Sequence, residues 1–319
     1  NLEWQRTLDK NIGLDVSMFS NRFHINIDYY HKRTDPLIAN INMPVSMGIT
    51  SRRANVGIQV DQGVNGTIRY AFLYKPKLGI NYTMSFNFRY GKAFYDEIGR
   101  NLDQYNQENI AKNMVRYYDG GSPSALWAVR SRGIDPATGK EIFVKKDGSL
   151  TYTFDYDDEV EVGDTRPTLE GVWGNTFYWK GFTAALHVRY SFGADAFNST
   201  LFNKVENISS GDLTVNQDKR ALYDRWKKPG DKAKFKGISL TETTPMSSRF
   251  VMKENYIEIE SVNIGYQFNS KKLKQKLGIS SLNIRAYMNS IARFSTLEDE
   301  RGIYYPFARS FSFALSAIL

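Results

Sequence analysis

The sequence predicts an all-β protein, specifically an antiparallel transmembrane β-barrel of which this chain forms part. Long segments alternate strictly between apolar and polar residues, as in LGINYTMSFNFRYG (Leu78–Gly91). The connections between these segments alternate between a few residues and several tens of residues. No apolar run approaches the roughly 18–20 residues of a membrane-spanning helix, which excludes a helical membrane protein. A membrane barrel is compatible with the mean hydropathy of −0.46, because half of each strand faces a polar interior.

Nine segments are predicted to be strands because their side chains alternate with a period of two. In chain order they are Leu8–Met18, Phe23–Tyr30, Val56–Tyr74, Leu78–Gly91, Pro167–Trp179, Phe182–Phe192, Asn255–Phe268, Leu282–Asn289 and Ser310–Leu319. Gly63 and Gly66, inside the third segment, indicate a bulge or a bend there. In the seventh segment the apolar phase shifts near Glu260–Ser261, which predicts a β-bulge.

The alternation assigns side chains to two faces. Those expected to face the barrel lumen are Asn81, Thr83, Ser85, Asn87, Arg89, His187, Arg189, Asn283, Arg285 and Asn289. Those expected to face lipid are Ile80, Tyr82, Met84, Phe86, Phe88, Leu186, Val188 and Tyr190. We therefore expect a charged substitution to be tolerated on the first face and damaging on the second.

The lengths of the connections favour a membrane barrel over a soluble sandwich. The short connections are Ser20–Asn21, Lys75–Leu78, Lys180–Gly181 and Ser270–Ser280. The long connections are Thr34–Arg53, Lys92–Thr165, Gly193–Ser248 and Ile291–Ala308. Short periplasmic turns at one end and long extracellular loops at the other are typical of outer-membrane barrels. A soluble sandwich needs strands of only about five or six residues and rarely carries such loops.

The strand number predicts that the chain continues a longer barrel. Bacterial single-chain barrels have an even number of strands. Nine strands alone would leave open edges, whose unpaired backbone groups are costly in lipid. Because the chain also begins inside a strand-like pattern, we expect other strands to precede residue 1.

The composition contains no catalytic or metal-binding pattern. The absence of cysteine excludes disulfides, thiolate metal sites and cysteine nucleophiles. The three histidines, His24, His31 and His187, have no metal-ligand spacing. His187 and Ser191 share a strand face, but that face is expected to line the lumen, whereas the active site of an outer-membrane lipase should face lipid. No P-loop is present, so we expect neither a cofactor nor an enzyme activity.

Two charged segments are interpreted as exposed loops. The segment Lys219–Lys236 is strongly basic, in a chain of net charge +8 and pI about 9.3. Nucleic acid is one interpretation of such charge. A loop that faces an acidic ligand or a partner protein is favoured instead, because the segment joins two predicted barrel strands on the exterior side. The acidic run Asp155–Asp164 lacks the spacing and glycine of an EF-hand, which favours a solvated loop over a calcium site.

Several stretches resemble the C-terminal part of the SusC/RagA-like TonB-dependent outer-membrane transporters of Bacteroidetes. They include NLEWQRTLDKNIGLDV, NRFHINIDYYHKRTDPLI, SSRFVMKENYIEIESVNIGYQF and YYPFARSFSFALSAIL, in this order along the chain. The resemblance implies that residues 1–319 form about the last nine strands of a 22-stranded barrel in the outer membrane. The plug domain and the N-terminal strands would lie outside this chain.

The resemblance also implies a function and partners. It implies active import of glycans or peptides, driven by the TonB complex, with a SusD-like surface lipoprotein above the long loops. Loop residues expected to contact substrate or partner are Tyr117, Tyr118, Trp127, Arg225 and Trp226. Two alternatives stay open: a passive porin or structural barrel without energy coupling, and a soluble carbohydrate-binding β-protein. The unpaired apolar faces argue against the soluble alternative.

Overall fold

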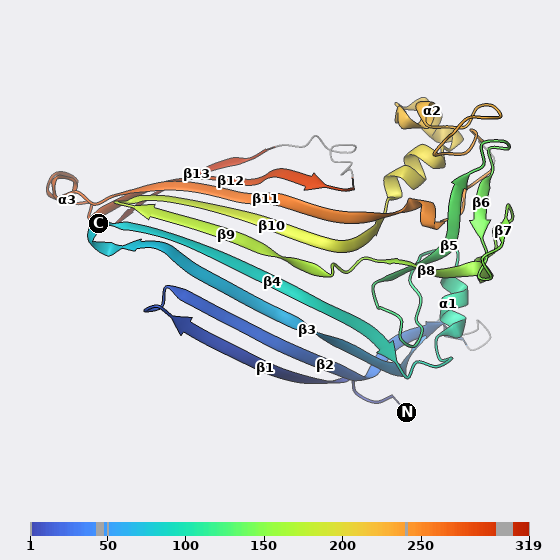
Figure 1. Cartoon of the computed structure of the whole chain (residues 1–319), viewed down its shortest axis with the longest axis horizontal. Coiled ribbons are helices and arrows are strands. Elements are labelled where there is room, and N and C mark those ends of the chain that lie inside the picture. Colours follow the sequence, from blue (N-terminus) through green and yellow to red (C-terminus); the bar gives the residue numbers. More distant parts are fainter. Residues whose placement is uncertain (1, 43–47, 50, 240–241, 298–308, 319) are drawn as a thin grey trace.

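The computed structural model describes residues 2–42, 48–49, 51–239, 242–297 and 309–318. Nine long strands in these residues form one antiparallel sheet, in the order β1-β2-β3-β4-β9-β10-β11-β12-β13 (Figure 1). Their bounds are β1 Arg6–Met18, β2 Phe23–Asn42, β3 Ser51–Lys75, β4 Ile80–Asp96, β9 Leu169–Trp179, β10 Phe182–Phe197, β11 Val251–Phe268, β12 Ser281–Ser295 and β13 Phe311–Ile318. The sheet confirms the predicted fold class and the predicted number of strands. No helix of the described residues is both long and apolar enough to cross a membrane.

The remaining elements lie mostly at one end of this sheet, at the right of Figure 1. A small second sheet has the order β7-β6-β5-β8, with β5 Ala125–Ile134, β6 Glu141–Val144, β7 Leu150–Thr151 and β8 Glu159–Asp164. Two helices lie near it, α1 Asp103–Asn109 and α2 Arg220–Tyr223. We refer to residues 97–168 as the first long loop and to residues 198–250 as the second long loop. The opposite end carries the short turns and α3, Lys271–Leu277, which occupies the predicted turn Ser270–Ser280.

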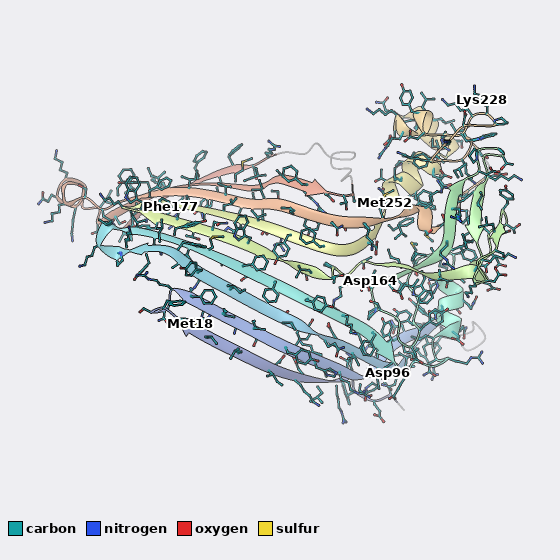
Figure 2. The ribbon with its side chains drawn as sticks, viewed as in Figure 1. Met18, Asp96, Asp164, Phe177, Lys228 and Met252 are labelled. Atoms are coloured by element: carbon teal, nitrogen blue, oxygen red, sulfur yellow. The ribbon has the colours of Figure 1, made fainter. Side chains whose placement is uncertain are left out.

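The predicted boundaries of the long connections were wrong, because the strands extend further toward the loops. β2 continues to Asn42 and β4 to Asp96, which is labelled at the loop end of the strand in Figure 2, whereas loops had been predicted to begin at Thr34 and Lys92. β10 and β12 likewise reach Phe197 and Ser295. The extensions of β2, β4 and β10 pack against loop residues, so their side chains no longer follow the simple alternation between a polar and an apolar surrounding. The rest of the predicted connection Ile291–Ala308 lies largely outside the described residues.

One predicted bulge is confirmed and another is misplaced. The register of β10 and β11 shifts at His187/Val188, and that of β11 and β12 shifts between Ile259 and Ser261. The strand β3 keeps its register with β4 through Gly63 and Gly66 and shifts instead between Ala71 and Leu73. This shift places Tyr74 opposite Asn81, so Tyr74 leaves the apolar series in which it was predicted.

The two glycines instead make room for rings. A Cβ on Gly66 would lie 2.4 Å from the Phe88 ring, and one on Gly63 would lie 2.8 Å from the Tyr30 hydroxyl. Tyr30 therefore crosses the neighbouring strand on one face of the sheet, and Phe88 does so on the other. Gly66 is needed for close approach of the Phe88 ring. Gly63 is needed for close approach of both the Tyr30 hydroxyl and the β4 backbone, because an added Cβ would lie 2.3 Å from the carbonyl oxygen of Tyr90.

One face of the sheet is apolar and largely uncovered. Directly paired residues share a face, so Phe86 lies beside Trp173, and Trp173 beside Val188. The rings of Phe86 and Tyr190 stack with centroids 5.3 Å apart. Even so, Phe86 in the middle of the sheet is 39% exposed, and Phe313 on β13 is 80% exposed. A contiguous exposed apolar face of this kind indicates a surface that contacts other molecules or another part of the protein.

The opposite face is polar. A continuous row of directly paired residues, here named the central polar row, crosses eight strands. It consists of Ser17, His24, Arg69, Ser85, Gly174, His187, Ser261 and Asn289. Every residue predicted to face the lumen lies on this polar face, and every residue predicted to face lipid lies on the apolar face. What each face contacts in the complete protein stays a prediction.

Candidate functional site

The two long loops pack against each other and form a structured layer at one end of the sheet. Met114, Leu126 and Ala128 from the first long loop and β5 form a buried apolar cluster. Phe197, Met246 and Val251, from the second long loop and its flanking strands, pack against this cluster. A second cluster within the second long loop contains Leu201, Val205, Ile208, Ala221, Phe235 and Phe250. The loops therefore have a hydrophobic core of their own, which explains how connections of this length can be ordered.

A buried ion network joins the loops. Arg249 donates to Glu206 at 2.7 and 3.2 Å and to Glu141 at 3.0 Å. The carboxylates also accept hydrogen bonds from Ser247 and Thr244, at 2.6 and 2.9 Å. Burial lowers the pKa of Arg249, but the two carboxylates outweigh that effect and raise the pKa above its usual value. Glu141 lies on β6 and Glu206 on a π-helix, Leu201–Glu206, so the network connects residues 108 positions apart.

A second buried pair orders the first long loop internally. Arg116 donates to both oxygens of Glu159, at 2.7 and 3.0 Å, and to the backbone carbonyls of Ile110, Asn113 and Val115. A buried charge is tolerated when it is paired and hydrogen-bonded in this way. The pair fixes the chain between α1 and β5 against the start of β8.

Trp226 fastens the second long loop to the first. Its indole Nε1 donates to the backbone carbonyl of Pro136 at 2.9 Å. Its ring lies against Gly139, where an added Cβ would be 2.4 Å from the ring. Gly139 has a φ of +71°, so it also provides the left-handed backbone of the β5–β6 turn.

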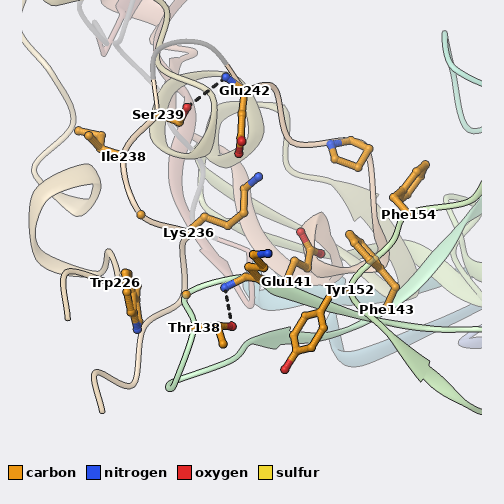
Figure 3. Close-up of a pocket in the computed structure, with 14 residues that line it drawn as sticks. Thr138, Glu141, Phe143, Tyr152, Phe154, Trp226, Lys236, Ile238, Ser239 and Glu242 are labelled. Carbon is orange, nitrogen blue, oxygen red and sulfur yellow. Dashed lines mark hydrogen bonds between the residues drawn. The ribbon is translucent and has the colours of Figure 1, made fainter. Parts of the chain in front are cut away.

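A pocket of about 550 Å³ opens between the loops beside this contact. Figure 3 shows the Trp226 ring on one side of the pocket and the rings of Tyr152, Phe143 and Phe154 on the other. Lys236 and Glu242 also line it. Rings, a cation and a carboxylate around one hollow suit a solute that has both apolar faces and polar groups.

The structure separates the loop residues predicted to bind a ligand. Trp226 lines the pocket, whereas Arg225 is buried and donates to the carbonyls of Val205, Glu206 and Lys236. Burial lowers the pKa of Arg225. The hydrogen bonds of Arg225 thus lie inside the second long loop.

The remaining three candidates lie inside the first long loop. Tyr117 packs between Tyr95 and Tyr105, with ring centroids 5.3 and 5.4 Å away. Tyr118 lies against Trp127, at a centroid distance of 4.8 Å. Burial raises the pKa of both tyrosines. Sequence reasoning missed the pocket residues Phe143, Tyr152 and Phe154 and the Arg249 network, because short irregular segments bring them together.

The histidines form no catalytic arrangement. His187 Nδ1 lies 3.1 Å from Ser261 Oγ. His24 Nδ1 lies 3.0 Å from Ser17 Oγ and 3.4 Å from Asp15. In a serine triad the serine and the carboxylate use different ring nitrogens, whereas both partners here approach Nδ1. In the described part of the chain, no group of three or more His, Asp or Glu side chains is placed to hold a metal ion.

Comparisons with known proteins agree with a barrel of this kind. No protein-family model matches the chain. It is 24% identical over 347 residues to TonB-dependent receptor P39 of Formosa agariphila, covering 93% of this chain and 32% of that protein. It is 23% identical over 348 residues to TonB-dependent receptor SusC of Bacteroides thetaiotaomicron, covering 99% and 32%. The homologues of this chain are TonB-dependent receptors.

The fold comparison gives the same result. A solved structure of the RagAB peptide transporter superposes with a TM-score of 0.78 at 19% identity, covering 93% of this chain and 32% of that chain. The chain thus has the fold of part of a transporter barrel. It spans about a third of the length of the curated relatives that it matches.

Gly139 offers a direct test of the contact between the loops. Gly139→Ala should displace the Trp226 ring and open the pocket, in addition to about 1–2 kcal/mol of left-handed backbone strain. The fluorescence of Trp226 is obtained by subtracting the spectrum of the corresponding Trp226→Phe variant, and it reports the environment of the Trp226 ring. We expect greater access of a soluble quencher in the Gly139→Ala protein.

Gly148→Ala is the matched control. Gly148 has a φ of +87° in the next turn of the same loop, but an added Cβ would meet nothing within 4 Å. This substitution carries the same kind of strain without moving Trp226. Equal quenching in both variants would contradict the proposed role of Gly139.

Proposed function

We propose that residues 1–319 form the C-terminal portion of the barrel domain of a TonB-dependent importer in the outer membrane. The observation that carries the proposal is a nine-stranded sheet with one uncovered apolar face, one polar face, short turns at one end and packed loops at the other. In the complete protein the apolar face contacts lipid and the polar face lines the lumen. The rest of the barrel pairs with the free edges of β1 and β13, because open edges are not stable in lipid.

The loop layer is proposed to bind the solute on the extracellular side. The pocket beside Trp226 offers aromatic rings and charged groups to an oligosaccharide or a peptide. A SusD-like lipoprotein is proposed to cover this layer, in keeping with the relatives named SusC and RagAB. Transport then consists of binding and conformational change rather than of covalent chemistry.

Dependence on TonB separates this proposal from a passive porin. We expect cells that produce the full-length protein to take up labelled oligosaccharides or peptides only when TonB is present. Uptake is measured in matched strains with and without TonB, over a range of solute concentrations. A rate that saturates and disappears without TonB supports an importer. A rate that rises linearly and persists without TonB would support the porin instead.

A further inference from the structure

The half of the polar face nearest the short turns carries cations but no carboxylate in the described residues. This turn-side half runs from the central polar row to the turns. Its arginines are Arg22, Arg69 and Arg285, and the turns add Lys75, Lys77 and Lys180. No aspartate or glutamate of β1–β4 or β9–β13 lies below the central polar row, since Asp15 and Asp28 are on the loop side of it. The potential of this surface is therefore positive.

In the loop-side half of the same face, the cations named below form ion pairs with carboxylates. These ion pairs include Lys32–Asp9 at 3.3 Å, Arg166–Asp61 at 2.9 Å, Arg89–Glu170 at 3.7 Å, Arg189–Glu260 at 2.5 Å and Arg293–Glu254 at 2.7 Å. The two halves thus differ in whether their arginines have carboxylate partners, and not simply in the number of arginines. In the described residues, an anion that moves along the middle of this face meets arginines that are already paired with carboxylates, and it meets Arg22, Arg69 and Arg285 without such partners near the turns.

Two of the unpaired arginines line a pocket of about 340 Å³ on the polar face. Asn21, Asn81 and Thr83 line it as well and supply polar groups at its wall. The Arg22 guanidinium lies 5.7 Å from the centre of the Tyr74 ring, which lines the pocket too. In the described chain neither Arg22 nor Arg69 forms an ion pair or a side-chain hydrogen bond. The volume of this pocket lies within the range of roughly 300–1,000 Å³ that is typical of small-molecule sites.

We propose that this pocket binds a carboxylate group of the solute as it passes toward the turn end of the barrel. The inference rests on the proposed function, because it assumes that the polar face lines the path of the solute. Guanidinium groups recognise carboxylates through two parallel hydrogen bonds. They also stay charged at every physiological pH. Two unpaired guanidiniums at one pocket repel each other, and a bound anion relieves that repulsion.

The test is binding of acidic probes to the purified full-length protein. Trigalacturonate and a triglutamate peptide carry the carboxylate on different frames, and their methyl esters remove the charge while keeping the frame. We expect isothermal titration calorimetry to show binding of at least one acid, weakened by added salt, and no matching binding of its ester. The acid that binds more tightly identifies the source of the carboxylate. Equal binding of acid and ester would overturn the proposal.

Variants assign the binding to the pocket. Arg22→Gln/Arg69→Gln should weaken acid binding about tenfold or more, and lysine at both positions should restore part of it. Arg6→Gln/Lys10→Gln removes the same charge from the opposite face and should change the affinity less than about twofold. Gel mobility before and after heating checks that each barrel is folded. Unchanged affinity in the folded glutamine variant would overturn the site, even if uptake proves to be TonB-dependent.

Discussion

Phe86→Arg is expected to impair insertion of the barrel, whereas Asn87→Arg, one residue further along β4, is expected to be tolerated. Phe86 lies on the apolar face between Ile68 and Trp173, and Asn87 lies on the polar face between Thr67 and Val172. An arginine on the lipid side of a barrel strand destabilises the folded state by about 2–4 kcal/mol near the middle of the bilayer. On the lumen side its guanidinium remains hydrated. Folding into lipid vesicles, followed by denaturant titration, measures the difference.

Phe86→Leu separates the effect of charge from the loss of the ring. The leucine keeps an apolar side chain but removes the stacking of Phe86 on Tyr190. Stacking of this kind contributes about 0.5–1.5 kcal/mol beyond burial. We therefore expect a smaller loss for leucine than for arginine. Equal losses for Phe86→Arg and Asn87→Arg would show that the two faces are wrongly assigned.

The sheet could be predicted from the sequence because one physical rule governs most of its length. Between the turns and the loop layer, each side chain meets either an apolar or a polar surrounding, so the period of two is preserved. The prediction failed where that rule stops. At the loop end of β2, Leu37, Ala39 and Ile41 pack against the cluster of Val56, Tyr95, Ile98 and Leu102. Their environment depends on residues far along the chain, which no local period reveals.

The loop site was predictable only in part for the same reason. Trp226 was identified because it is a tryptophan in a basic exterior loop, and it does line the pocket. Arg225, its neighbour, was identified by the same argument but turns inward to backbone carbonyls. The sequence shows no difference between the two that would predict this. Glu141 and Glu206 are brought together because both bind Arg249. This contact could not be predicted from the sequence, since short loop segments carry no periodic signal.

Arg249→Met is expected to release the loops while leaving the sheet intact. The substitution leaves Glu141 and Glu206 buried without their cation, and the loss of one partner from a buried ion pair typically destabilises by about 3–5 kcal/mol. The effect should be local, because the network lies in the loop layer and the long strands retain their ladders. Trypsin reports the change, since Lys227 and Lys232 are exposed in the second long loop and neither is followed by proline. We expect faster cleavage there and unchanged heat-dependent gel mobility of the barrel.

Two further variants decide whether buried charge is the cause. Glu141→Gln/Glu206→Gln/Arg249→Met removes all three charges and should recover much of the protection, because a neutral replacement of a whole buried network is often close to neutral in stability. Arg100→Ala breaks an exposed pair with Asp103 and should change cleavage little, as surface pairs contribute about 0–1 kcal/mol. Cleavage of Arg249→Met at the wild-type rate would mean that the apolar clusters alone hold the loops together. The pocket beside Trp226 would then depend on the packing of Met114, Leu126 and their neighbours rather than on the ion network.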